Sequence, residues 1–373
     1  MAEKKKKTKA KEEGNPYQAR VDFEQMEEEL CKLLGRYLKK AIKSGSFEVY
    51  MNSHRKKFLT EATALIKRFT GKAQRDARFI LNATYEASTY AEAKRAYANA
   101  GKSDKAIKVI FGGQNEPKLK ALEDELAYSE REASVSILRA IDDKYKRITE
   151  DAMKLYTGGD MDLEHAVQAG TEDLRKHGIK AVPYKDGRKV NAASYIEMAA
   201  RTANQRAKFY GEGAFREKIG NYLVIVSSHI STCELCAPWQ GKILIDDVFS
   251  GPVPDEVMRR HEGKYATVSE AIEAGAFHPN CRHQLSTWYE GVSQKSAKTG
   301  AAEQRKAYYK AEVKQRALER EIRADKRAWA LATNSRDRAE AAEELKKSQA
   351  KMAKHLKENP QLKEIDWREK VYS

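Results

Sequence analysis

The feature that most constrains the fold is a run of apolar residues between positions 138 and 155, which recur at alternating three- and four-residue steps. This spacing places them on one face of a single helix. A seam of this kind suits a helical hairpin or bundle, in which helices bury against each other rather than around a ligand. We therefore predict a long helix after Pro117, with a seam made of Leu138, Ile141, Tyr145, Ile148, Ala152 and Leu155.

The first hundred residues have the same helical character. From Tyr17 the apolar residues again follow three- and four-residue steps, and Gly45-Ser46 interrupts this helix. The stretch 55–100 is rich in Ala, Lys, Arg and Glu, and we predict a helix there with breaks at Gly71 and Gly101. The simplest interpretation of this half is a scaffold or assembly surface. The apolar face of the first helix consists of Phe23, Met26, Leu30, Leu33 and Tyr37.

The charge balance also favours long solvated helices. The 373 residues include 70 Lys and Arg against 55 Asp and Glu, which gives a formal net charge of +15. Charged residues make up 34% of the chain and aromatic residues only 9%, so one large globule is disfavoured. No stretch approaches the roughly 20 consecutive apolar residues of a membrane span. The basic excess is compatible with nucleic acid, an acidic protein partner or solubility alone.

The chain opens with a lysine-rich segment, residues 1–15, that is almost without apolar side chains. Such a run is typical of a disordered, solvated arm, and less often of a nucleic-acid contact. It lacks the apolar stretch of a secretory signal, so we expect no export to an oxidising compartment. Its lysines include Lys4, Lys5, Lys6, Lys7, Lys9 and Lys11.

The pattern changes after Gly158-Gly159. A helix over 162–177 is predicted to end at Gly178, because a glycine often follows the last helical turn. Asp186-Gly187 is a hairpin signal between two short strands, and Asn191 suits the N-cap of a following helix.

The strongest strand signal is the β-branched run 222–227, which predicts a buried strand. We expect neighbouring strands at 242–245 and 284–289, with a short helix at 267–274. The middle of the chain is therefore predicted to be a compact α+β unit.

Helical periodicity returns beyond Gly291. An Arg-rich helix is predicted over 301–331, with Leu318, Ile322 and Trp329 on one face, and another over 336–356. The predicted fold class is thus mostly α with a small α+β central domain, flanked by long helical hairpin or bundle arms. The predicted domains are a basic disordered tail (1–15), an N-terminal helical domain (16–157), an α+β core (158–293) and a C-terminal basic helical extension (294–373).

Three of the four cysteines and four of the eight histidines fall within residues 229–283. Cys233 and Cys236 form a Cys-x2-Cys pair on a predicted turn, where two thiolates can converge on one tetrahedral zinc ion. The second half-site is His278-Pro-Asn-Cys281-Arg-His283, and mixed sulfur and imidazole ligands favour zinc. We predict a structural zinc held by Cys233, Cys236, Cys281 and one of His278 or His283.

Other interpretations of these residues remain open. The cluster could consist of reduced thiols brought together by chance in a small core. His229 is a weaker ligand candidate, interpreted as a capping or packing residue. Cys31 lies among leucines on the first helix and is interpreted as a packing residue. So few cysteines in so long a chain do not form a disulfide scaffold.

The sequence carries few signs of an enzyme. A catalytic zinc needs an open coordination position and a nearby general base. Glu234 and Asp246-Asp247 lie near the cysteines, but neither a deaminase His-x-Glu pattern nor a helical His-Glu-x2-His is present. Gly211-x-Gly213 is predicted to end a helix, so it is not a nucleotide-binding fingerprint. A closed structural site and a non-enzymatic protein are the predictions.

An ordered series of short motifs in the middle section resembles the minor capsid, or head morphogenesis, proteins of tailed bacteriophages. The resemblance is to the minor capsid protein 2 group related to the Mu F-like proteins, and it covers residues 163–327. The motifs are Gly187-Arg188, Tyr195-x2-Met198-x2-Arg201-Thr202, Val224-Ile-Val-Ser-Ser-His229, Cys233-x2-Cys236-x-Pro238-Trp239-x-Gly241-Lys242, His278-Pro-Asn-Cys-Arg-His283 and Glu290-Gly291-Val292.

The resemblance implies a non-enzymatic virion protein. Proteins of this family associate with the portal protein at one vertex and assist head assembly or DNA delivery, so major capsid or scaffold protein is a further expected partner. The expected location is the capsid at the portal vertex, after assembly in the host cytoplasm. The basic charge would suit sequence-independent contact with packaged DNA. Arg201, Thr202 and Trp239 are interpreted as packing residues beside the metal turn.

Two other hypotheses are kept. One is a phage-encoded toxin-like or nucleic-acid-processing enzyme that uses the Cys/His cluster. The other is a zinc-knuckle nucleic-acid-binding protein, for which duplex binding with a sequence preference should survive raised salt.

Overall fold

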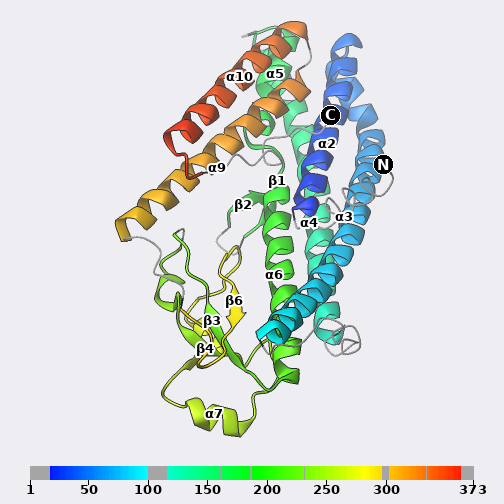
Figure 1. Ribbon diagram of the computed structural model, residues 1–373. Coiled ribbons are helices and arrows are strands. Elements are labelled where there is room, and N and C mark those ends of the chain that lie inside the picture. Colours follow the sequence, from blue (N-terminus) through cyan, green and yellow to red (C-terminus); the bar gives the residue numbers. More distant parts are fainter. Residues whose placement is uncertain are drawn as a thin grey trace, which may run out of the picture. The chain divides into compact units, whose positions relative to one another are not determined.

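The long helices expected from the apolar spacing are present in the computed structural model, which is mostly helical with two small sheets (Figure 1). The structure describes residues 17–99, 116–159, 161–184, 187–230, 232–295, 302–332 and 334–362. The predicted basic tail, residues 1–15, lies outside this part of the chain. The helices are α2 (Gln18–Lys43), α3 (Phe47–Asn99), α4 (Glu116–Thr157), α5 (Leu163–His177), α6 (Ala192–Lys218), α7 (Asp255–His261), α8 (Val268–Glu273), α9 (Ala302–Leu331) and α10 (Ser335–Glu358).

Two details of the helix predictions are wrong. Gly71 does not break α3, which runs without interruption from Phe47 to Asn99. One glycine in a helix interior costs only about 1 kcal/mol, which the packing of neighbouring apolar residues offsets. Gly211 and Gly213 lie inside α6 rather than at its end, since that helix continues to Lys218.

The described residues form two compact units, each assembled from separate stretches of chain. The sheet unit comprises described residues within Met1–Gln18, Arg75–Ala127 and Met198–Tyr309. The bundle unit comprises those within Ala19–Gln74, Tyr128–Glu197 and Lys310–Ser373. The domain boundaries given above stay a prediction. In the described part of the chain, no helix has the length and apolarity needed to cross a bilayer.

A four-stranded sheet with strand order β5-β4-β3-β6 forms the centre of the sheet unit. The central strand β3 pairs antiparallel with β4 and with β6, while β5 lies parallel to β4. This confirms the three predicted strands; β5 and α7, within or next to the charged loop 247–265, were not predicted. The strands are β3 (Leu223–Val226), β4 (Ile243–Ile245), β5 (Ala266–Thr267) and β6 (Leu285–Thr287).

Both faces of this sheet are covered, which explains why β3 is apolar at every position. Val224 and Val226 pack on one face against Phe209 of α6 and Val268 of α8. Leu223 contributes to a second cluster on the opposite face, which includes Trp288, Val257 and Met258. Successive strand residues point to opposite faces, so a strand buried on both sides cannot alternate with polar residues.

The glycines of α6 allow close helix packing. A Cβ atom at Gly213 would lie 2.1 Å from the carbonyl oxygen of Phe249, and one at Gly211 would lie 2.5 Å from that of Tyr85. Both distances are too short for a side chain. These positions therefore bring α6 against the backbone of the Phe249 loop and of α3.

In the bundle unit, α2 and α3 form an antiparallel hairpin that packs on α4. The rings of Tyr37 and Phe58 lie 5.4 Å apart, and Phe58 lies 4.6 Å from Tyr145 of the α4 seam. The Tyr145 hydroxyl donates to the carbonyl oxygen of Met51 at 2.7 Å. Four of the six predicted seam residues, Ile141, Tyr145, Ile148 and Ala152, are buried, whereas Leu138 and Leu155 are only partly buried.

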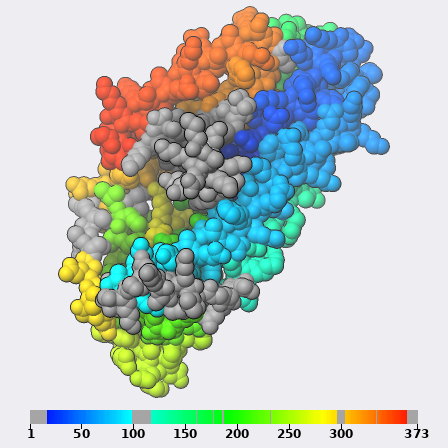
Figure 2. All heavy atoms as spheres, turned by 45° about the vertical axis from the view of Figure 1, so that its right-hand side comes forward, coloured from blue at the N-terminus to red at the C-terminus, as the bar shows by residue number. Residues whose placement is uncertain are grey.

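The remaining helices and strands of the bundle unit form where the sequence patterns predicted them. Asp162 caps α5, which ends at Gly178 with a φ of 64°. Strands β1 (Lys180–Pro183) and β2 (Lys189–Asn191) form the expected hairpin, and the Asn191 side chain accepts from Ser194 N at the start of α6. Leu318 and Ile322 of α9 pack against Met352 of α10. Figure 2 shows α10, in red and orange, on the surface of this unit.

Candidate metal centre

The Cys-x2-Cys pair lies on the connection between β3 and β4, where the backbone turns tightly. Ala237 N donates to the Cys233 carbonyl and Trp239 N to the Cys236 carbonyl, both at 3.0 Å, which leads into the short 3-10 helix η2 (Ala237–Trp239). Gly241, with a φ of 70°, then returns the chain to β4. The turn therefore holds the sulfur atoms of Cys233 and Cys236 on one short segment of the chain.

The second half-site lies on the loop between α8 and β6, and its backbone is strained. Phe277 and Asn280 have φ angles of 53° and 68°, which residues other than glycine seldom adopt. Cys281 N donates to the His278 carbonyl at 2.9 Å and closes the turn. Strain of this kind persists where the surrounding structure holds a functional arrangement.

The two half-sites meet through three close contacts. Cys233 Sγ lies 3.1 Å from His278 Nε2, Cys236 Sγ lies 3.7 Å from Cys281 Sγ, and Cys281 Sγ lies 3.4 Å from His283 Nδ1. Two groups result, Cys233–Cys236–His278 and Cys236–Cys281–His283, and within each group all ligand atoms lie within 4.8 Å of one another. These groups could hold a metal ion, and Cys236 belongs to both.

The contact between Cys236 and Cys281 has the spacing of donor atoms in a tetrahedral centre. Zn–S bonds of about 2.3 Å and Zn–N bonds of about 2.0 Å place neighbouring sulfur atoms about 3.8 Å apart, and sulfur and nitrogen about 3.5 Å apart. The 3.7 Å between Cys236 and Cys281 matches the first value, and these cysteines are free thiols. Cysteine thiolates with imidazole are the donor set that zinc prefers.

The two histidines both carry features of metal ligands. His278 Nδ1 lies 2.8 Å from the Pro279 carbonyl oxygen, so Nδ1–H donates there and Nε2 is the nitrogen that faces Cys233. Burial, with His229 and His278 nearby, lowers the pKa of His283 to about 4, so this ring is neutral at neutral pH. A neutral imidazole is the form that binds metal.

The thiols differ in their environments. Burial and the nearby Cys281 raise the pKa of Cys236 to about 12, and burial also raises the pKa of Cys281. For Cys233, burial acts in the same direction, but the hydrogen bond with His278 and bonds with Cys236 outweigh it and lower the pKa. A bound cation would replace the thiol protons at all three positions.

The other residues singled out in the sequence have structural contacts. His229 belongs to neither group; its Nε2 lies 2.9 Å from Ser227 Oγ and its ring packs 4.6 Å from that of His283. Glu234 is exposed on the turn. Asp246 is fully buried and pairs with Arg216 at 2.7 Å.

Three side chains of α6 support the second half-site, and the sequence prediction missed two of them. Gln205 Nε2 donates to the His283 carbonyl, and Lys208 Nζ to Gln284 Oε1 at 2.6 Å. Arg201 Nη1 lies 3.5 Å from Asn280 Oδ1. Positions 201, 205 and 208 follow the i, i+4, i+7 spacing of one helix face, a signal present in the sequence.

Comparison with known proteins first indicates the class of protein, which is that of phage structural proteins. The chain is similar to a "Structural protein" of Lactococcus phage LL-H, with 25% identity over 183 residues, which is 46% of this chain and 47% of the relative. The match thus spans about half the length of that relative. No solved structure matches.

The family follows from a match over most of the chain. Residues 18–357 match the model of the family described as Phage minor capsid protein 2, and the chain belongs to that family. The match extends beyond residues 163–327 to include the N-terminal helices, and it confirms the resemblance. The protein is therefore a minor capsid component of a phage virion, and the family is a structural one.

Proposed function

We propose that this minor capsid protein associates with the portal vertex and assists procapsid assembly or DNA packaging and delivery. It acts through binding surfaces rather than catalysis, with the portal protein, and major capsid or scaffold protein, as partners. In the same proposal, Cys233, Cys236 and Cys281, with His278 or His283, hold one structural zinc ion. Zinc would join two half-sites of a small fold and so stabilise it.

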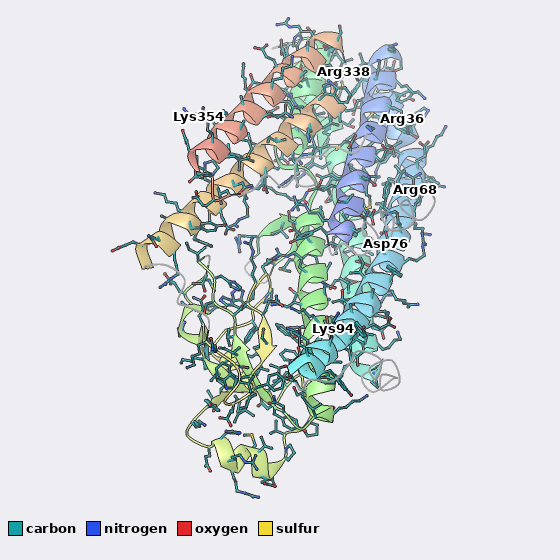
Figure 3. The ribbon with its side chains drawn as sticks, viewed as in Figure 1. Arg36, Arg68, Asp76, Lys94, Arg338 and Lys354 are labelled. Carbon is teal, nitrogen blue, oxygen red and sulfur yellow. The ribbon has the colours of Figure 1, made fainter. Side chains whose placement is uncertain are left out.

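The observation that carries the DNA contact is a basic face on the α2–α3 hairpin of the bundle unit. Between residues 35 and 68, eight basic side chains are exposed, whereas Glu48 is the one exposed acid. Figure 2 shows the hairpin, in blue, on the surface, and in Figure 3 Arg36 and Arg68 point away from their helices. The basic face consists of Arg36, Lys39, Lys40, Lys43, Lys56, Lys57, Lys67 and Arg68.

Most of these cations have no acidic partner among the described residues. The Arg36–Glu61 separation is 3.9 Å, and the six lysines of the basic face form no ion pair within the described residues. Lysines of α10 differ, since Lys347 pairs with Glu344 and Lys351 with Glu321. Unpaired cations on one face suit the phosphate backbone, which they bind without regard to sequence and with strong salt dependence.

Removal of charge from the basic face should weaken DNA binding. We expect the triple substitution of Lys39, Lys40 and Lys57 by Gln to lower affinity for a random-sequence duplex by about tenfold or more at low salt, and to flatten the dependence of log K on log salt. The matched control replaces Lys347, Lys351 and Lys354 of α10 by Gln. Equal losses in both triples would show that only net charge matters, and the assignment to the hairpin would be wrong.

Association with the vertex is tested by co-expression with the cognate portal protein. We expect the two proteins to co-purify through an affinity tag on the portal and to remain together in size-exclusion chromatography at raised salt. A tagged major capsid protein is the control bait. Failure to co-purify with the portal would refute the vertex assignment without affecting family membership.

A further inference from the structure

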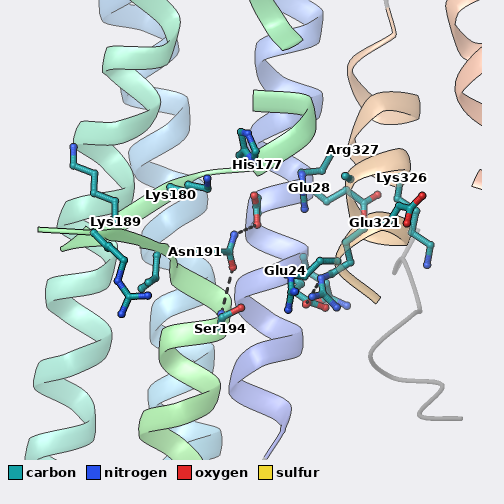
Figure 4. Close-up of a pocket in the computed structure, with 17 residues that line it drawn as sticks. Glu24, Glu28, His177, Lys180, Lys189, Asn191, Ser194, Glu321, Lys326 and Arg327 are labelled. Carbon is teal, nitrogen blue, oxygen red and sulfur yellow. Dashed lines mark hydrogen bonds and ion pairs between the residues drawn. The ribbon is translucent and has the colours of Figure 1, made fainter. Parts of the chain in front are cut away.

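The bundle unit contains a pocket that the proposed function does not use. Its volume is about 680 Å³, and it is lined by residues of α2, the β1–β2 hairpin, the start of α6, and α9. Figure 4 shows charged side chains from these elements along its lining, among them Glu24, Lys189 and Lys326. A volume of this size accommodates a small ligand or a few side chains of a peptide.

One wall of the pocket is built tightly around Glu27. Its Oε1 accepts from the backbone N–H of Ile179 at 2.7 Å, and its Oε2 accepts from Asn191 Nδ2 at 2.9 Å. A Cβ atom at Gly178 would lie 1.9 Å from Glu27 Oε1. Glycine at this position therefore allows α2 and the β1–β2 hairpin to meet, and the wall is formed without a ligand.

The other acidic side chains of the lining are also paired with groups of the protein. Glu24 accepts from Arg20 at 2.8 Å and lies 3.7 Å from Arg323. Glu28 pairs with Lys32 at 2.7 Å, and Glu321 with Lys351 at 2.6 Å. Each carboxylate thus has a cation or donors already.

Three cations of the lining are not balanced in the same way. Lys180, Lys189 and Arg320 are exposed, and within the described residues none of the three forms an ion pair. Burial lowers the pKa of Lys144, and the charges of Arg147, Lys180 and Lys189 lower it further. Lys180 and Lys189 therefore lie close enough to other cations to repel them, and among the described residues they have no acidic partner of their own.

We infer that the pocket binds an acidic segment of a partner protein, whose Asp or Glu carboxylates take the place of the missing counter-ions. Arginine and lysine bind carboxylates through charge-assisted hydrogen bonds, and an arginine can do so with two. A concave site of this volume admits single side chains of an extended peptide, whereas a DNA duplex requires an open face such as the hairpin. The inference rests on the proposed function only in that the protein acts through protein partners.

The test uses the full chain and a fluorescein-labelled hexaglutamate peptide, followed by fluorescence anisotropy, with hexaglutamine as the uncharged peptide. We expect hexaglutamate to bind, hexaglutamine not to bind, and the pocket triple Lys180→Gln, Lys189→Gln, Arg320→Gln to weaken hexaglutamate binding about tenfold or more. The control is a triple of α10, Lys346→Gln, Lys347→Gln and Lys354→Gln, which removes the same charge outside the pocket and the basic face and should keep the peptide affinity.

Three outcomes would overturn the inference that the pocket binds an acidic segment. Absence of hexaglutamate binding, or an equal loss in both triples, would show that the pocket has no specific role. A pocket triple that loses duplex binding instead would assign the site to nucleic acid. Thermal unfolding checks that the triple is folded, and the single variant Arg320→Gln replaces it if it is not. The peptide-binding assay contains no portal protein, so a negative result would not count against the proposed association with the portal vertex.

Discussion

Substitution of Cys281 by Ser is expected to remove about one equivalent of zinc from the purified protein and to unfold the sheet unit at a much lower temperature. The sulfur of Cys281 lies 3.7 Å from Cys236 and 3.4 Å from His283, so its loss breaks the contact between the two half-sites. A cross-link over a loop of this length is worth about 4 kcal/mol in chain entropy alone. Metal analysis and thermal unfolding, each with and without a chelator, measure both effects.

The matched control is Cys31→Ala, which removes a buried thiol of α2 in the bundle unit. This variant should keep its zinc. Comparison of His278→Ala with His283→Ala then identifies the fourth ligand, because only the true ligand's loss lowers metal affinity strongly. Wild-type protein that is metal-free and equally stable in chelator would contradict the zinc proposal.

Substitution of Asp246 by Ala is expected to destabilise the sheet unit by about 3–5 kcal/mol, because it leaves a fully buried guanidinium without its counter-ion. The Arg216 side chain is inaccessible to solvent and donates to Asp246 at 2.7 Å and to Ser250 at 2.9 Å. Asp246 also accepts from the backbone N–H of Phe249 at 2.9 Å. Chemical denaturation followed by circular dichroism measures the change in unfolding free energy.

The neighbouring Asp247 provides the control. It accepts from the backbone N–H of Ser269 at 3.0 Å near the start of α8, so Asp247→Ala should cost only about 1 kcal/mol. Comparable stability of the Asp246 and Asp247 variants would show that the buried pair does not stabilise the fold. The Asp246 variant also tests the enzyme hypothesis. If Asp246 were a general base, its replacement should lower the activity of the protein and leave its stability unchanged.

Local signals in the sequence predicted the elements well because each depends on nearby residues. The α4 seam, the helix end at Gly178, the Asn191 cap and the β-branched run of β3 all correspond to observed elements. The two-residue strand β5 and the seven-residue helix α7, which lie within or next to the charged stretch 247–265, were missed. Gly71 was misjudged because tertiary packing outweighs helix propensity.

Long-range arrangement was harder to predict. The cysteines and histidines that the sequence grouped together are close in space, but the contacts of Gln205 and Lys208 to the second half-site depend on where α6 packs. The basic pocket combines residues near positions 24, 189 and 320, and no local pattern connects them. The compact units are likewise discontinuous in sequence, which composition shifts cannot reveal.

The separation of the two half-sites affects how the chain is made. Cys236 and Cys281 are 45 residues apart, and β6, which pairs with the central strand β3, follows the second half-site. During synthesis the chain emerges from its N-terminus, so β3, Cys233 and Cys236 leave the ribosome before their partners exist. This region can fold only after Thr287 has been translated. A truncated chain therefore cannot present the finished sheet, and only chains translated past this point can enter a growing virion correctly folded.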